Sequence, residues 1–358
     1  MISGPYPVVM SNGVGGWHSK YAVKGPGVVT GRSGTIGGLQ YIEGDFWPHN
    51  TSLWVTSFNG NEPKFIYWLY SSLNLERFGS GSGVPTLNRN DVHDQLIGVP
   101  CNIAEQRRIG AFFDRLDSLI TLHQRKYDKL CVLKKSMLDK MFPKGGSLYP
   151  EIRFAGFTDP WEQRKLGELT ESYSGGTPAA GESEFYGGSI PFIRSAEIAA
   201  ESTELFLTEK GYESSSARMV KPGDVLYALY GATSGEVAVS RQKGAINQAI
   251  LAILPRDDCD ARYITAWLRK QKGYIVTTYL QGGQGNLSGV IVKNLEVFIP
   301  SLPEQQKIGF MLSHLDSLIT LHQRKYDGCA NPLFLERRIS CRKPSHQNRC
   351  SATTTPSG

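Results

Sequence analysis

The stretch LDSLITLHQRKYD occurs twice without a change, first as Leu116–Asp128 and again as Leu315–Asp327. Each copy follows a closely similar stretch, EQRRIG at residues 105–110 and EQQKIG at residues 304–309. Copies that lie about 200 residues apart are too distant for a solenoid or a propeller, whose repeats are about 20–50 residues long. The spacing therefore predicts one large module, a globular domain followed by a helix, that is used twice.

Residues from about Glu105 to Phe142 are predicted to form one long helix, because apolar side chains recur every three or four residues. Two such stripes favour an antiparallel coiled coil in which the helices bury each other. The alternative is that each helix packs only on its own globular domain. The residues expected to pair the helices are Phe113, Leu116, Ile120, His123, Tyr127, Leu130, Leu315, Ile319, His322 and Tyr326. Further apolar residues expected to widen the first stripe are Ile109, Phe112, Leu119 and Leu133.

The segments before the two helices are rich in Gly, Tyr and β-branched residues, which is typical of mixed strand-and-loop domains. They also resemble each other, since Phe65–Leu69 corresponds to Tyr263–Leu268 and Lys24–Gly31 to Lys221–Gly231. We predict an α/β (mixed α+β) fold with two such domains joined by long spacer helices. The predicted segments are a first domain that is short at its N-terminus (1–98), a central spacer helix (99–146), a second domain (147–300), a second spacer helix (301–327) and a divergent, disordered tail (328–358).

The net charge of +6 comes largely from the end of the chain, because residues 328–358 carry five Lys and Arg against one Glu. Charge alone therefore does not establish a nucleic-acid-binding protein. No stretch approaches the roughly 18–20 apolar residues of a membrane span, and the N-terminus lacks a signal-peptide pattern. The six cysteines form no CxxC pair. These features predict a reduced, cytoplasmic protein that does not enter a membrane.

Motifs for catalysis are missing from the sequence. It contains no P-loop, no Asn-Pro-Pro-aromatic or Asp-Pro-Pro-Tyr box for adenine methylation, and no zinc-like spacing of Cys and His. His123 and His322 lie on the helical stripes, where a structural role is favoured over catalysis. The Gly-rich segments 31–34 and 81–83 lack the Lys-Ser/Thr of a phosphate loop and are read as tight turns. We expect a non-catalytic chain without a metal or cofactor site.

Several short motifs occur in a fixed order. They are the entry Trp161 to Leu169, the turn Ser174–Pro178, the strand Lys221–Leu226, and the junction from Ile299 to Ile308 with its following helix. In this order, and duplicated, they resemble the DNA-specificity subunit of type I restriction–modification enzymes over most of residues 1–327.

The resemblance implies two target-recognition domains, each of which reads half of a split double-stranded DNA sequence. It also implies that the long helices act as a spacer and as a dock for two methyltransferase subunits, with restriction/translocase subunits completing the complex. S-adenosylmethionine, ATP and Mg²⁺ would then be bound by those partner subunits, and none by this chain.

The sequence departs from the family pattern in two places. Met1 aligns near Phe185, so the first domain has no counterpart of Trp161–Glu184. After Asp327 the helical pattern stops abruptly, which suggests a frameshift or a recombination joint. The alternative function is therefore a defective or silent subunit that binds the methyltransferase without directing it.

Reading DNA requires cations for phosphates and side chains such as Arg, Asn and Gln that make paired hydrogen bonds to base edges. Such residues lie on the predicted loops of both domains, where binding residues are common. Leading candidates among them are Asn12, Arg32, Arg194 and Gln284, whereas Trp47, Trp54 and Trp68 are expected in the core. The full set of predicted DNA contacts is Asn12, Lys20, Lys24, Arg32, Arg194, Ser195, Thr233, Ser234, Arg241, Lys243, Gln284 and Asn286.

Overall fold

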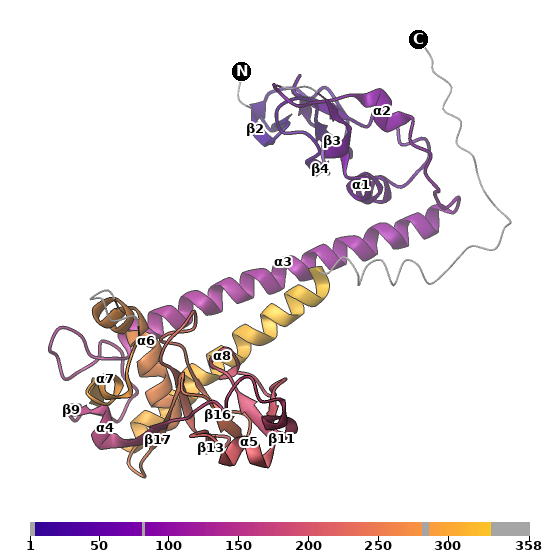
Figure 1. Ribbon diagram of the computed structural model, residues 1–358. Helices are drawn as coiled ribbons and strands as arrows, with labels where there is room; N and C mark the ends of the chain where they lie inside the picture. Colours follow the sequence, from indigo (N-terminus) through magenta and orange to yellow (C-terminus); the bar gives the residue numbers. More distant parts are fainter. Residues whose placement is uncertain (1–3, 81–82, 281–285, 331–358) are drawn as a thin grey trace. The chain divides into compact units, whose positions relative to one another are not determined.

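The computed structural model describes residues 4–80, 83–280 and 286–330. The chain divides into two compact units, a first unit of Met1–His123 with Lys325–Gly358, and a second unit of Gln124–Arg324. Figure 1 shows strands and helices in both units, which confirms the predicted mixed α/β fold. The predicted contact residue Gln284 and the predicted tail beyond residue 330 lie outside the described residues, and the domain boundaries drawn from the sequence stay a prediction.

The first unit contains two three-stranded sheets with the strand orders β2-β1-β5 and β4-β3-β6. Its hairpin β1–β2 turns at Ser11 and Asn12, between the paired residues Met10 and Gly13, and Gly13 has a φ of 127° that other residues rarely adopt. Val9, Val29 and Phe46 form the core between the sheets. Its elements are β1 (Tyr6–Met10), β2 (Gly13–His18), β3 (Gly27–Gly31), β4 (Leu39–Ile42), β5 (Trp47–Pro48), β6 (Ser52–Trp54), α1 (Pro63–Ser72), η1 (Leu75–Phe78), β7 (Gly79–Ser80), β8 (Thr86–Leu87) and α2 (Arg89–His93).

The second unit contains two four-stranded sheets, ordered β12-β11-β16-β13 and β10-β17-β14-β15, and the pair β18-β9. Its main core joins Phe142, Trp161 and Tyr263, whose rings contact one another. Its elements are β9 (Glu162–Lys165), α4 (Leu166–Leu169), β10 (Thr170–Ser174), η2 (Ser183–Phe185), β11 (Tyr186–Ile193), η3 (Ser195–Glu197), β12 (Phe206–Leu207), α5 (Glu209–Glu213), β13 (Arg218–Val220), β14 (Val225–Ala228), β15 (Val237–Val239), β16 (Gly244–Ile246), β17 (Ile250–Pro255), α6 (Ala261–Leu280), α7 (Gly289–Lys293) and β18 (Glu296–Ile299).

The two units repeat one arrangement of strands. A parallel pair, β1 with β5 and β11 with β16, stands beside an antiparallel sheet built on β3 or β14. The second unit adds β10 beside β17 and β9 beside β18. In the described part of the first unit no element fills those two places, residues 95–100 form no strand, and Leu96 is fully exposed.

The two long helices are α3 (Ile103–Lys140) and α8 (Leu302–Ala330), close to the predicted bounds. A buried glutamine anchors the start of each. Gln106 accepts a hydrogen bond from the N–H of Glu62 at 2.8 Å, and Gln305 accepts one from the N–H of Asp260 at 3.0 Å. Each of these glutamines also donates to the carbonyl of a proline just before its helix. The similar stretches before the exact repeat therefore fix each helix to its own domain in the same way.

Two arrangements of the apolar stripes were considered, pairing of the two helices and packing of each helix on its own domain, and the structure contains both in part. Within the second unit, the Lys134 side chain of α3 forms an ion pair with Asp316 of α8, and Figure 1 shows α8 alongside this part of α3. Near the domains each helix packs on its own unit instead, with Phe113 against Trp68 and Leu315 in the main core.

Three of the residues expected to widen the first stripe are exposed. The exposed fractions are 50% for Phe112, 40% for Leu119 and 41% for Leu133, because these side chains lie beside the half-buried stripe rather than on it.

Candidate nucleic-acid interface

In the second unit, the parallel strands β11 and β16 end side by side, because Ile193 pairs with Ile246. The next residues, Arg194 and Asn247, therefore follow the carboxyl ends of neighbouring parallel strands. In open parallel α/β sheets ligands bind outside the carboxyl ends of the strands, and this parallel pair presents two such strand ends side by side.

The turn of Gly175, Gly176 and Thr177 lies against these strand ends. Gly176 donates its N–H to the carbonyl of Ile246 at 3.2 Å, and the Thr177 hydroxyl donates to the side-chain oxygen of Gln248. A Cβ atom at Gly175 would lie 1.8 Å from the Ile246 carbonyl oxygen, so this close approach requires glycine. The turn thereby presents exposed Thr177 and Gln248 beside Arg194.

The turn between β14 and β15 closes onto the same region through Leu229. The N–H of Leu229 donates to the carbonyl of Ala249 at 2.8 Å. Its own carbonyl accepts the Ser234 hydroxyl at 3.1 Å and the N–H that follows Asn286 at 3.0 Å. The structure thus brings together three predicted contacts, Thr233, Ser234 and Asn286. The Thr233 hydroxyl is buried and has no hydrogen-bond partner among the described residues.

Arg194 is already paired with a carboxylate. Its guanidinium donates to the two carboxylate oxygens of Glu197 at 3.1 and 2.7 Å, and the Thr203 hydroxyl donates to the same carboxylate. These hydrogen bonds, led by that from Arg194, lower the pKa of Glu197 to about 2. Ser195 follows at the start of η3. A base contact by Arg194 would have to exchange this partner, and its predicted role stays a prediction.

Arg241 and Lys243 occupy a different place, the turn after β15, at the end of that strand opposite to Thr233 and Ser234. Arg241 forms an ion pair of 3.0 Å with Glu201. Both cations are exposed, so they remain available to phosphates but do not join the other predicted contacts.

The first unit has an equivalent arrangement at the ends of β1 and β5, where Val9 pairs with Pro48. Thr51 connects the neighbouring turns. Its carbonyl accepts the N–H of Arg32 at 2.7 Å, and its hydroxyl accepts the N–H of Ser11 at 3.4 Å. His49 contacts the same hydroxyl at 2.9 Å. Exposed Asn12, next to Ser11, and exposed Arg32 are therefore brought together.

Lys20 and Lys24 are exposed but lie elsewhere in the first unit. Lys20 follows β2 at the open end of the hairpin, where Tyr6 pairs with His18, and Lys24 precedes the start of β3. The opposite ends of these strands carry Asn12 and Arg32. A five-residue strand is about 17 Å long, so the two lysines could contact a different part of a bound duplex.

We call each arrangement a strand-end cluster. The first cluster comprises Asn12, Arg32, His49 and Thr51, and the second comprises Thr177, Arg194, Thr233, Ser234, Asn247, Gln248 and Asn286. Sequence reasoning missed His49, Thr51, Thr177, Asn247 and Gln248. The Ser174–Pro178 turn was recognised as a family motif, and its two close glycines could have pointed to Thr177. His49 and Gln248 depend on strand pairing over long separations, which no local pattern contains.

Exposed aromatic side chains add to the first unit's surface. Trp17 and Tyr21 have exposed fractions of 53% and 48%. Trp54, which was expected in the core, is 37% exposed because it ends the edge strand β6. Among the described residues, no group of His, Cys, Asp or Glu could hold a metal ion, and no helix is long and apolar enough to cross a membrane.

Two α/β units that each start a long helix, with polar clusters at equivalent strand ends, define a duplicated recognition architecture. The family model described as type I restriction modification DNA specificity domain matches this chain at residues 4–131 and again at 158–328. The chain belongs to this family, and the double match agrees with the predicted duplication.

Individual relatives are similar over part of their length. The chain is 31% identical over 187 residues to the type I restriction enzyme MjaIX specificity subunit of Methanocaldococcus jannaschii, covering 49% of this chain and 42% of that protein. It is 26% identical over 194 residues to the EcoR124I/EcoR124II specificity subunit of Escherichia coli, covering 48% of each. The chain thus spans about half the length of these curated relatives.

A crystal structure of the type I restriction–modification S subunit from M. genitalium superposes with a TM-score of 0.64 at 14% identity. The superposition covers 95% of this chain and 88% of the S subunit chain. At this identity the similarity shows that the fold is shared, including two domains and long helices.

Proposed function

We propose that this chain is the DNA-reading subunit of a type I restriction–modification complex, and that each unit reads one half of a split double-stranded target. The observation that carries the proposal is the equivalent position of the two strand-end clusters, which have the same backbone frame but different side chains. Asn, Arg and Gln side chains in such clusters can pair with base edges, and each paired contact contributes about 1–3 kcal/mol of discrimination.

The helices would set the distance between the halves. α3 has 38 residues, which corresponds to roughly 57 Å. Its start is fixed to the first domain by Gln106, and α8 is fixed to the second domain by Gln305. Two methyltransferase subunits would dock on the exposed apolar side chains of these helices, and restriction/translocase subunits would complete the complex in the cytoplasm.

The chain would direct chemistry rather than perform it. Methylation of an adenine inside a duplex requires that the base be flipped into a pocket. That pocket, with S-adenosylmethionine, would belong to the methyltransferase, and ATP and Mg²⁺ to the partner subunits.

The proposal is tested by co-expressing the chain with its methyltransferase and mapping methylated adenines across the host genome. A split, asymmetric motif is expected. Arg32→Ala should relax the bases of one half and Gln248→Ala those of the other, whereas Arg89→Ala on the exposed surface of α2 should change neither. A complex that assembles intact but methylates nothing would reject the proposal in favour of a silent subunit.

A further inference from the structure

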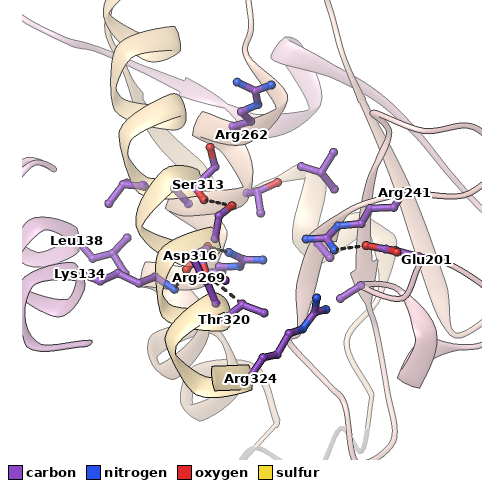
Figure 2. Close-up of a pocket in the computed structure, with 18 residues that line it drawn as sticks. Lys134, Leu138, Glu201, Arg241, Arg262, Arg269, Ser313, Asp316, Thr320 and Arg324 are labelled. Atoms are coloured by element: carbon purple, nitrogen blue, oxygen red, sulfur yellow. Dashed lines mark hydrogen bonds and ion pairs between the residues drawn. The ribbon is translucent and has the colours of Figure 1, made fainter. Parts of the chain in front are cut away.

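A cavity of about 520 Å³ lies within the second unit, separate from the strand-end cluster. Its walls come from α3, α6 and α8 and from the loops at residues 199–201 and 238–241. Figure 2 shows charged side chains on opposite sides of the cavity, with Arg241 and Glu201 facing Asp316 and Arg269 across it. Along α8 the lining runs from Leu312 to Arg324, which corresponds to roughly 18 Å of helix.

The lining is strongly cationic. Its acidic residues are Glu201 and Asp316, and its basic residues are Lys134, Arg241, Arg262, Arg269 and Arg324. The lining therefore carries five positive charges against two negative ones. A concave surface of one sign concentrates ions of the opposite sign.

The internal ion pairs leave positive charge uncompensated. Asp316 is shared between Lys134 and Arg269, so one carboxylate serves two cations. Arg241 is paired with Glu201. Arg262 and Arg324 have no ion-pair partner among the residues that the structure describes. Both therefore keep free guanidinium groups, whose planar forks suit the two-oxygen contacts that phosphates offer.

The hydroxyl groups in the cavity wall are already used as donors within their own helices and do not add donors for an anion. Ser313, Ser317 and Thr320 of α8, and Thr265 of α6, each donate to a carbonyl of their own helix. The anion-binding capacity of the cavity thus rests on its arginines and lysine. Their charge and the forked geometry of guanidinium groups suit the phosphate oxygens of a nucleic acid backbone.

The cavity forms a groove along α8 from Leu312 to Arg324. We propose that this groove binds the sugar–phosphate backbone of the DNA that the second unit reads. The extended length favours a chain of phosphates over a single ion, because a duplex carries one negative charge per about 1.7 Å of its axis. The proposal deepens, and rests on, the proposed DNA-reading function. It assigns affinity without sequence preference to the groove, whereas the strand-end cluster provides the choice of bases.

The duplicated sequence supplies a matched control. Arg125 and Arg324 occupy the same position of the identical repeat and both are exposed, but Arg125 on α3 does not line the cavity. In the first unit Lys64 lies against Gly110 as Arg262 lies against Gly309, but Lys64 forms an ion pair of 3.2 Å with Asp114, so its charge is compensated.

The test compares Arg324→Gln, Arg262→Gln and Arg125→Gln in the purified full-length chain. Binding to a duplex that contains the mapped target and to an unrelated duplex is measured between about 50 and 200 mM salt. Each loss of a phosphate contact should reduce the slope of log affinity against log salt by about 0.9 and weaken both duplexes roughly 3–10-fold. Arg125→Gln should match the wild type.

Equal slopes for Arg324→Gln, Arg262→Gln and Arg125→Gln would overturn the proposal. So would binding of inorganic pyrophosphate or ATP that depends on Arg324 but does not compete with DNA, because the groove would then serve a free phosphate compound. If the chain does not read a DNA sequence, the wild-type chain should bind both duplexes equally well. This result differs from equal salt slopes among the variants, so failure of the proposed function can be told from failure of the groove proposal.

Discussion

The Lys134 ammonium of α3 forms an ion pair with the Asp316 carboxylate of α8, and the same carboxylate also accepts Arg269 of α6. Asp117 occupies the same position of the first repeat, yet it is exposed. One residue type in one local sequence therefore has two environments.

Asp316→Asn should lower the free energy of unfolding of the second unit by about 1–2 kcal/mol, because Lys134 and Arg269 would face each other without an anion. Asp117→Asn, the same change in the same sequence, should cost less than about 0.5 kcal/mol. Urea unfolding of the two variants measures the difference. Equal effects would show that Asp316 does not hold the three helices together.

Gln305→Ala should be more costly than any exposed substitution nearby. The Gln305 side chain is 1% exposed and satisfies the N–H of Asp260 and the carbonyls of Asp258 and Pro300. Its removal leaves the buried carbonyl of Pro300 and the two partly buried groups unpaired, so a loss of about 2–4 kcal/mol is expected. Gln306→Ala, on the exposed side of the same helix, is the control and should be nearly neutral. Thermal unfolding followed by circular dichroism compares the two variants.

The Arg194–Glu197 pair predicts a stability that depends on acid pH. The pKa of Glu197 is lowered from 4.5 to about 2 in the folded chain, chiefly by the hydrogen bond from Arg194. A lowered folded-state pKa gives stability that is present above about pH 4.5 and is lost as the pH falls toward 2. We expect a contribution of about 1–2 kcal/mol, since Arg194 is half exposed.

Arg194→Gln should remove this part of the pH dependence, as measured by urea unfolding between pH 2 and 6. Arg241→Gln breaks a pair with Glu201 whose two side chains are 60% and 74% exposed, and it should leave the profile unchanged. A wild-type profile for Arg194→Gln would mean that another group sets the pKa of Glu197.

Leu122→Asp tests the proposed docking of methyltransferase subunits on the repeated helix surface. Leu122 is 44% exposed and Leu321, its counterpart in the second copy, is 45% exposed. If each copy docks one subunit, Leu122→Asp should change the complex from two methyltransferase subunits to one, as read by native mass spectrometry. Val132→Asp, at a 69% exposed position of α3 outside the repeat, should retain both subunits. Loss of a subunit only in Val132→Asp would place the dock elsewhere on the helix.

Local patterns predicted the helices well. The three- and four-residue spacing of apolar side chains placed α3 and α8 within a few residues of their observed bounds, because a helix is determined by neighbours in sequence. The same spacing did not decide which apolar residues are buried, because Phe112, Leu119 and Leu133 are exposed and the width of a buried stripe depends on what packs against it. Exposure of an individual side chain is a tertiary property.

The residues of the candidate interface were likewise indicated in part by the sequence and decided in part by the tertiary structure. Composition and Gly-rich loops indicated Asn12, Arg32, Arg194 and Thr233 as binding residues. The pairing of β1 with β5 and of β11 with β16 decided which of them lie together, and it added His49 and Gln248. Strand pairing joins residues that are more than 30 positions apart, so no local window of sequence can indicate it.

By itself, the sequence determined that one module is used twice, because thirteen identical residues recur in equivalent surroundings. It also determined the two long helices and the family to which the chain belongs. Only the tertiary structure decided what the identical residues do. Arg324 lines a cationic groove and Arg125 does not, because the neighbouring strands and α6 place Arg241, Arg262 and Arg269 around the second copy alone. The environment of a side chain is determined by the contacts that folding makes, and these differ even where the sequence does not.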